Sequence, residues 1–323
     1  MKVACVYHPR LYTGWGKFHF VADAFERIGC EVLRCQTLEE VRGADKTCDL
    51  VVYEQRSPAL CNDVDLVEFL KDRNAVHVQW YFDLNFFDDS PLEKQEAIAP
   101  FLRIARAMDL VFVKERSRLE DYDASGIRAV WLDQGCPSTM PQSRVVEAPA
   151  CDVVLWGSSR RLLWGQRCDD VQALVESGFT VGWASVTDGR LPDGVKPLPA
   201  VQPLELRQVI EQGKVTLVVD ARQDIEGYWS DRIWLAAGAG ACCVRRASVG
   251  SGHLPAFHYS STGMLVETVR ELCGDLQKRT ANGAFARERT MTLHTYEQRC
   301  REILEHAKAV REQRHQPAHL QAV

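Results

Sequence analysis

The sequence lacks a hydrophobic segment long enough to cross a membrane. No apolar run in the 323-residue chain approaches the ~18 residues that a transmembrane helix needs. The opening residues, MKVACVYHPR, turn polar too early for a signal peptide and read instead as a first β-strand. We therefore expect a cytoplasmic protein without a membrane span.

The spacings typical of protein metal sites are also missing. The twelve cysteines include no CxxC pair and no Cys/His cluster at zinc spacing, and the nine histidines include no HExxH. The two DxD pairs, Asp63/Asp65 and Asp121/Asp123, are of a kind that arises often by chance at this acidic content. We expect no bound metal, and reduced thiols that act as small hydrophobic side chains.

An excess of positive charge is absent as well. The chain has 39 basic and 44 acidic side chains, a net charge of −5. A protein that binds nucleic acid through a broad phosphate footprint is usually basic, so general nucleic-acid binding is disfavoured, although a local basic cleft stays open. With 46% hydrophobic and 26% charged residues, the composition is that of a globular protein and excludes a disordered, collagen-like or coiled-coil chain.

The chain alternates apolar strands with amphipathic helices, and it does so twice. Residues 1–135 form the first unit, with strands expected at 3–7, 31–33, 49–53, 76–82, 110–113 and 129–132. Residues 136–150 are rich in proline and small polar side chains and predict a linker. The pattern restarts in a second unit, 151–290, with strands expected at 152–156, 179–184, 215–219 and 241–244, and residues 291–323 form a C-terminal helix and tail. The sequence therefore predicts an α/β protein with two parallel sheets.

The loop after the first strand could bind a ligand. Gly14 and Gly16 would allow a close backbone approach before a helix. A dinucleotide fingerprint would need a third glycine at position 19, which is His19, so a nicotinamide-dependent oxidoreductase is disfavoured. A surface loop without a ligand is the alternative.

An apolar strand of the first unit, HVQWYF, ends at Asp83. A carboxylate at the rim of a parallel sheet is well placed to act as a general base on a bound hydroxyl. The alternative is a helix cap or a turn residue.

The turn that follows the first strand of the second unit suits a phosphate group. Its sequence, WGSSRR, combines Gly157 and Ser158 with two guanidinium groups, those of Arg160 and Arg161. A solvated basic turn is the alternative.

The segment EGYWSDRIWLAAGAG opens a second candidate anion site. Ser230 or Asp231 can cap the helix that follows. Arg232 then falls in the first turn, where its charge opposes the helix dipole, so either a bound anion or a neighbouring carboxylate would explain it.

These segments occur in an order that resembles a known family. DVVLWGSSRR, YWSDRIWLAAGAGACCV and HTYEQRCREIL resemble the C-terminal half of the CgeB-like (spore maturation protein type) glycosyltransferases, and the strand VQWYFD resembles part of their first half. The chain departs from the family pattern at Trp234–Leu235–Ala236, where a glutamate is usual, which puts one sugar or base contact in doubt.

The resemblance implies a GT-B architecture, two facing Rossmann-like domains with a cleft between them. It also implies a metal-independent glycosyltransferase that takes its sugar from a nucleotide-diphosphate sugar, a UDP-sugar above all, and needs no other cofactor. Asp83 or His8 would be the catalytic base. The donor-binding residues would be Gly157, Ser158, Arg160, Arg161, Ser230, Asp231, Arg232 and Gly238, and the acceptor-side residues would be Arg10, Gly14, Trp15, Gly16, Trp80 and Tyr81.

Several alternatives stay open. The acceptor is a hydroxyl of a glycan, a protein or a small molecule, or, as a minority option, a hydroxymethylated DNA base read with help from Arg103, Arg106, Arg116 and Arg118. The sequence does not decide between inversion and retention, nor does it fix the oligomeric state. A non-catalytic sensor of a nucleotide or sugar phosphate is the alternative function.

Overall fold

The computed structural model describes residues 1–7, 17–54, 63–82, 102–159, 161–185 and 190–315 and divides into two compact units. The first unit comprises Met1–Asp133 and Tyr296–Val323, and the second comprises Gln134–Thr295. The expected linker, 136–150, falls within the second unit, and the C-terminal helix returns to the first.

The first unit is built on a six-stranded parallel sheet with the strand order β2-β1-β3-β4-β5-β6. Its strands are β1 Lys2–Val6, β2 Glu31–Cys35, β3 Leu50–Glu54, β4 Val76–Trp80, β5 Leu110–Val113 and β6 Ala129–Trp131. Its helices are α1 Phe18–Arg27, α2 Leu38–Asp45, α3 Asp63–Phe69, α5 Leu119–Ala124 and α11 Tyr296–His315, with short 3-10 turns at Leu70–Asp72 and Arg116–Arg118.

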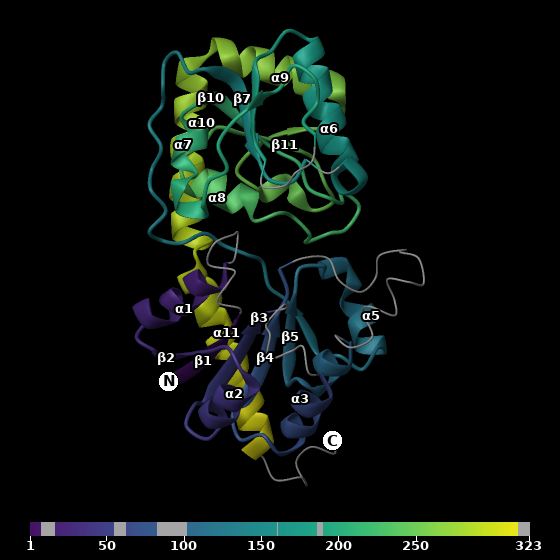
Figure 1. The fold of residues 1–323 in the computed structure, drawn as a ribbon, viewed down its shortest axis with the longest axis vertical. Helices are drawn as coiled ribbons and strands as arrows, with labels where there is room; N and C mark the ends of the chain where they lie inside the picture. Colours follow the sequence, from purple (N-terminus) through teal and green to yellow (C-terminus); the bar gives the residue numbers. More distant parts are fainter. Residues whose placement is uncertain (8–16, 55–62, 83–101, 160, 186–189, 316–323) are drawn as a thin grey trace. The chain divides into compact units, whose positions relative to one another are not determined.

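Two hydrophobic cores cover the two faces of this sheet. Val3 and Cys5 of β1 face a core shared with α1 and α11, whereas Ala4 and Val6 face a core shared with α2, α3 and α5. This alternation follows from the two-residue repeat of a strand. Helices α1 and α11 pack against each other although they lie at opposite ends of the chain (Figure 1), and the Cys300 thiol lies 3.6 Å from the carbonyl oxygen of Val21.

The second unit repeats the plan with the strand order β12-β11-β10-β7-β8-β9, again all parallel. Its strands are β7 Cys151–Trp156, β8 Val181–Ala184, β9 Lys196–Pro197, β10 Gly213–Val218, β11 Cys243–Arg246 and β12 Phe257–Tyr259. Its helices are α6 Arg161–Glu176, α7 Arg207–Ile210, α8 Arg232–Gly238, α9 Thr262–Gly274 and α10 Leu276–Leu293, with 3-10 turns at Pro203–Glu205 and Ser251–His253.

The structure corrects one helix of the sequence analysis and adds two strands. The apolar spacing of Leu265, Val269, Leu272 and Leu276 predicts a single late helix, but Asp275 is extended and its side chain caps a new helix, α10, by accepting from the Lys278 amide at 2.8 Å. The short edge strands β9 and β12 are additions, because two or three residues show no clear periodicity.

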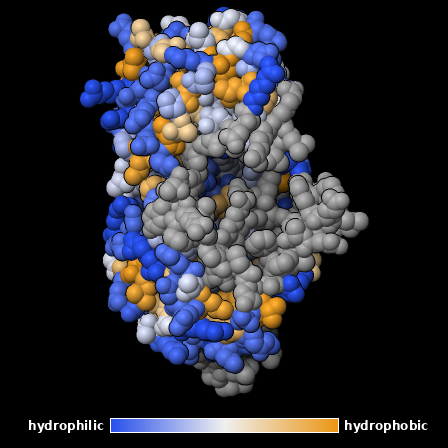
Figure 2. All heavy atoms as spheres, in the orientation of Figure 1, coloured by the Kyte–Doolittle hydropathy of each residue, from blue (hydrophilic) through white to orange (hydrophobic). Residues whose placement is uncertain are grey.

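The surface and the thiols fit a globular protein. Each of the eleven cysteines in the described ranges is a free thiol. Among the coloured atoms in Figure 2, hydrophobic residues lie in small groups between hydrophilic ones. Within the described residues, none of the helices combines the length and the hydropathy that a membrane crossing requires.

Candidate functional site

The strand order points to one place in the second unit. Strand β7 lies between β10 and β8, because the chain runs from β7 to β8 and β9 on one side and then crosses to β10, β11 and β12 on the other. In open parallel sheets, ligands bind beyond the carboxyl ends of the strands at such a switch point. Gly157 follows β7 and Asp220 follows β10, so both lie at this edge.

Gly157 and Arg232 are in direct contact there. Gly157 has a positive φ of 109°, and a β-carbon added to it would lie 2.5 Å from Nη2 of Arg232 and 2.8 Å from Nε. The absence of a side chain at Gly157 therefore makes room for the guanidinium group. Nη1 of Arg232 also donates to Oγ of Ser230 at 2.8 Å. Two segments predicted separately to bind a phosphate thus meet in the structure.

A second arginine, Arg167 of α6, binds the backbone at the same edge of the sheet. It is 1% exposed, and its guanidinium donates to the carbonyl oxygens of Ser158 at 3.0 Å and Val219 at 2.7 Å, which ties the ends of β7 and β10 together. Burial, and then repulsion from Arg232, lowers the pKa of Arg167 well below its ordinary value. Two guanidinium groups this close would be stabilised by an anion.

A buried carboxylate, Asp220, fixes the segment that carries Arg232. Its Oδ1 accepts from the backbone amide of Ser230 at 2.7 Å, and its Oδ2 accepts from Nη2 of Arg245. Arg245 is fully buried and also donates to Oγ of Ser248 at 2.8 Å. The hydroxyl of Ser230 donates in turn to Oδ1 of Asp231 at 3.2 Å.

A neighbouring ion pair has a different role. Asp170 of α6 accepts from Nη2 of Arg246 at 2.6 Å and from the Tyr259 hydroxyl at 2.8 Å. These contacts hold α6 against β11 and β12, and no hydrogen bond or ion pair described for Asp170 involves Ser230 or Arg232.

The other donor-side predictions have mixed outcomes. Ser158 lies beside Gly157 and supplies the carbonyl that Arg167 binds. Arg160 lies outside the described residues, and of Arg161 the structure describes only its place at the start of α6. Gly238 lies at the end of α8, where a β-carbon would be 2.8 Å from the sulfur of Cys136, so its small size serves packing there, and its predicted donor contact stays a prediction.

On the acceptor side, His8, Arg10, Gly14, Trp15, Gly16 and Asp83 lie outside the described residues. Trp80 and Tyr81 are described, and both side chains are fully buried. The Trp80 ring packs 4.7 Å from the ring of Phe82 in one core, and the Tyr81 hydroxyl donates to Gln79 at 2.8 Å. This placement argues against the predicted acceptor contact by either side chain.

The basic residues suggested for DNA mostly have partners within the first unit. Nε of Arg106 donates to the Ser125 carbonyl at 2.8 Å, and Arg118 pairs with Asp121. The guanidinium of Arg116 lies 5.5 Å from the centre of the Trp131 ring. These contacts are typical of surface arginines rather than of a groove that binds phosphates.

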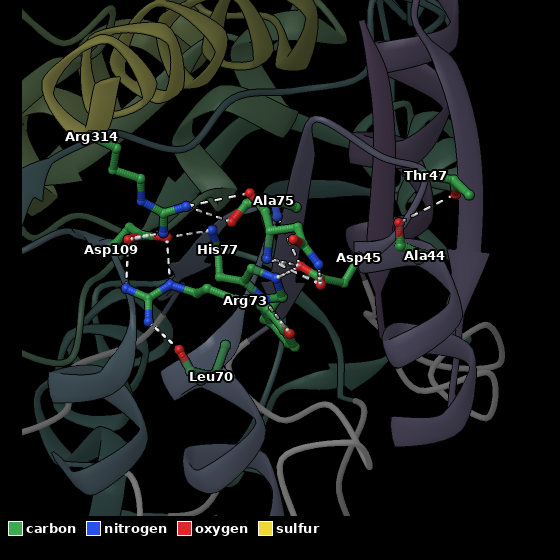
Figure 3. A network of polar contacts seen from close by, with 11 residues as sticks. Ala44, Asp45, Thr47, Leu70, Arg73, Ala75, His77, Asp109 and Arg314 are labelled. Atoms are coloured by element: carbon green, nitrogen blue, oxygen red, sulfur yellow. Dashed lines mark hydrogen bonds and ion pairs between the residues drawn. The ribbon is translucent and has the colours of Figure 1, made fainter. Parts of the chain in front are cut away.

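A dense polar network lies at the amino ends of the strands β4 and β5 of the first sheet, as Figure 3 shows. Nε2 of His77 lies 2.9 Å from Oδ1 of Asp45, and its Nδ1 lies 2.8 Å from the Tyr53 hydroxyl. Burial lowers the pKa of His77 against the opposing effect of Asp45, so the histidine is neutral. Burial alone would raise the pKa of Asp45, but the hydrogen bonds from His77 and from Ala75 and Asn74 lower it.

Asp109 joins this network to the C-terminal helix. It accepts from the His77 amide at 2.7 Å, from Nε of Arg73 at 3.0 Å and from Arg314 of α11. A cavity of about 250 Å³ lies alongside, lined by Asp45, Asn74 and Arg314 among others. Because these side chains already bind one another, the network holds α11 to the sheet.

Three buried groups at the donor edge were not predicted from the sequence: Arg167, Asp220 and Arg245. A signal for two of them was present, since Asp220 follows the apolar strand VTLVV and Arg245 follows the predicted strand ACCV. A charged residue at the carboxyl end of a buried strand is a candidate for the ligand edge. Across the described ranges, His, Cys, Asp and Glu side chains form no cluster of three or more that could hold a metal ion.

Most of the donor edge lies within a segment that matches a known protein family. Residues 158–305 match a family model described as "Glycosyl transferase-like", a span that includes Arg167, Asp220, Arg232 and Arg245. No curated protein matches the sequence.

Solved structures resemble the whole chain. BGT of T4 phage in complex with UDP-glucose is 12% identical with a TM-score of 0.65, covering 95% of this chain and 99% of that one. The DNA modifying enzyme beta-glucosyltransferase is 12% identical with a TM-score of 0.62, covering 95% and 99%. Anabaena Alr3699/HepE in complex with UDP is 12% identical with a TM-score of 0.62, covering 96% and 100%.

The likeness confirms the predicted fold class, the GT-B type with two Rossmann-like domains. Together, the family match and the fold confirm the predicted class of enzyme, a glycosyltransferase.

Proposed function

We propose that this glycosyltransferase binds the diphosphate of a UDP-sugar at the carboxyl edge of the second sheet and transfers the sugar to a hydroxyl acceptor. The observation that carries the proposal is the Arg232 guanidinium lying against Gly157 at the switch point of the sheet. The choice of UDP is supported by similar folds solved with UDP and with UDP-glucose. The order of the motifs supports a place in the CgeB-like group.

Arginine side chains would supply the positive charge that the reaction needs. As the bond from the sugar to the diphosphate breaks, negative charge grows on the leaving phosphate oxygens. A guanidinium can donate two parallel hydrogen bonds to such oxygens. In our proposal Arg232 makes this contact. Arg167 adds positive charge at the same edge of the sheet and holds the segments that follow β7 and β10 in place.

The acceptor hydroxyl would lose its proton to a base of the first unit. We propose Asp83, with His8 as the alternative, because in the sequence each comes shortly after a strand of the first sheet, Asp83 after β4 and His8 after β1. We also propose that the acceptor is a glycan, protein or small-molecule hydroxyl. A similar fold belongs to a DNA modifying enzyme, but the net charge of −5 and the internally engaged arginines of the first unit weigh against DNA here.

Calorimetric titration with UDP tests the donor site. An Arg232→Ala variant loses a charge-assisted hydrogen bond, which is worth about 1.5–3 kcal/mol, so UDP should bind about 10- to 150-fold more weakly. Arg190→Ala is the matched control, because Arg190 is 86% exposed and pairs with Asp193 on the surface of the same unit. UDP that binds Arg232→Ala as tightly as the wild type would refute the proposed site.

Mass spectrometry of reaction products tests the transfer. The protein is incubated with a pool of UDP-sugars and with glycan, peptide and small-molecule acceptors, with hydroxymethylated DNA in a separate arm. A mass increase of one sugar on an acceptor of the first group is the expected result, whereas an increase on the DNA alone would overturn the acceptor proposal. Binding of UDP without any transfer or hydrolysis would favour the sensor alternative.

A further inference from the structure

We infer that Asp220 is a positioning residue for the donor site, which it serves by locking the Ser230–Arg232 turn in the geometry that binds the diphosphate. The inference rests on the proposed function, because it assigns Asp220 an effect on donor binding through Arg232. Asp220 itself needs no contact with the donor.

The carboxylate of Asp220 is held from two sides. Asp220 is 3% exposed, and its two oxygens bind two different elements. One oxygen accepts from the Ser230 amide at 2.7 Å, and the other accepts from the guanidinium of Arg245 on β11. A carboxylate held on both sides in a buried place has a single orientation, so it fixes the Ser230 backbone relative to the sheet.

Ser230 in turn contacts the guanidinium group of Arg232. The Ser230 hydroxyl accepts from Nη1 of Arg232 at 2.8 Å and lies 3.4 Å from its backbone nitrogen. The same guanidinium lies against Gly157. A continuous chain of contacts therefore runs from Arg245 through Asp220 and Ser230 to Arg232.

The negative charge of Asp220 is balanced by Arg245. Arg245 is fully buried, and Asp220 is the carboxylate with which it forms an ion pair. The pair is neutral as a whole, so Asp220 can hold the turn without placing an unbalanced negative charge beside the phosphate site. An asparagine at position 220 would keep the shape but leave Arg245 without its counter-ion and weaken the bond to Ser230.

The test compares Asp220→Asn with Asp170→Asn. Both changes neutralise a buried aspartate that pairs with an arginine of β11, but only Asp220 contacts the Ser230–Arg232 turn. We expect UDP to bind Asp220→Asn at least about fivefold more weakly, and to bind Asp170→Asn within about twofold of the wild type, at a temperature where both variants are folded. Equal losses in the two variants would overturn the inference, because they would indicate general destabilisation.

A double-mutant cycle that combines Asp220→Asn with Arg232→Ala separates positioning of Arg232 from a general structural role. If Asp220 acts through Arg232, adding Asp220→Asn to Arg232→Ala should change the Kd for UDP less than about twofold. Independent, additive losses would overturn the inference. If Asp220→Asn does not fold, Asp220→Glu replaces it in the same cycle, since it keeps the charge for Arg245 but moves the carboxylate by one methylene.

Failure of the inference is distinguishable from failure of the proposed function. Arg232→Ala with unchanged UDP binding would refute the donor site itself. Arg232→Ala with weakened binding and Asp220→Asn with wild-type binding would leave the donor site standing and reject the positioning role.

Discussion

Replacing Gly157 with alanine is the sharpest single test of the donor site. An alanine β-carbon would lie 2.5 Å from Nη2, 2.8 Å from Nε and 2.9 Å from Cζ of Arg232, distances that non-bonded atoms do not sustain. The guanidinium is the flexible end of a long side chain, so we expect it to move away rather than the backbone to deform. The variant therefore displaces Arg232 without changing its chemistry.

Two costs should follow, and they can be separated. The φ of 109° at Gly157 is unfavourable for alanine, which costs about 1–3 kcal/mol of folding free energy and lowers Tm by about 2–12 °C. Displacement of Arg232 adds the loss of its bond to the phosphate, about 1.5–3 kcal/mol of binding free energy. UDP should then bind about 10- to 150-fold more weakly.

Gly178 supplies the matched control. It has a φ of 86° at the end of α6 in the same unit, and, its two chain neighbours aside, no atom of the described residues lies within 4 Å of the place where its β-carbon would stand. Gly178→Ala should therefore show the backbone cost in a thermal melt but leave UDP affinity unchanged in calorimetry. Equal UDP affinity in the two alanine variants would refute the placement of Arg232 against Gly157 as the basis of donor binding.

Four further predictions concern the first unit. Below pH 6.5 the free energy of unfolding should fall by up to about 1.4 kcal/mol per pH unit, because the unfolded chain protonates His77 whereas the folded chain, in which the pKa of His77 is lowered, keeps it neutral. Urea melts between pH 7 and 5 measure this slope. The same slope in His77→Gln would contradict the prediction. A further loss is expected below about pH 4, where the unfolded chain protonates Asp45 and the fold, with its lowered pKa, resists. Arg314→Ala removes bonds to Asp109 and to a backbone carbonyl from a side chain that is 29% exposed, so it should cost about 1 kcal/mol in a chemical melt; a loss no larger than that of the surface control Arg190→Ala would show that these bonds do not hold α11. Asp83→Asn should lower turnover about 10²- to 10⁴-fold with the Kd for UDP within twofold, and unchanged turnover would reject Asp83 as the base.

The sheets could be predicted from the sequence because their strands are buried on both faces. DLVVY, DVVLW and VTLVV read as continuous apolar runs between helical segments, a pattern that few other structures produce. The two-residue strand β9 carries no such signal. The end of α9 was missed because the apolar spacing continues through Leu276 while a single residue, Asp275, breaks the helix.

The donor site could be predicted only in part. Gly157 stood out as part of a turn that suits a phosphate, and Arg232 because its charge opposes the helix dipole. That the two meet could be seen only in the three-dimensional fold. Asp220 and Arg245 are ordinary charged residues in sequence, and their importance comes from burial and from one another. The buried side chains of Trp80 and Tyr81 show why an acceptor contact is hard to predict, because an aromatic residue near the end of a strand can point into a core as readily as into a site.

The return of α11 to the first unit affects how the chain is made. Tyr296, Cys300, Ile303 and Val310 belong to the same core as β1 and α1. During synthesis on the ribosome, the continuous stretch Gln134–Thr295 is complete while the earlier part of the chain still waits for its last helix. A premature stop codon near position 295 would thus leave the second unit complete and remove from the first unit the helix that covers one of its hydrophobic cores.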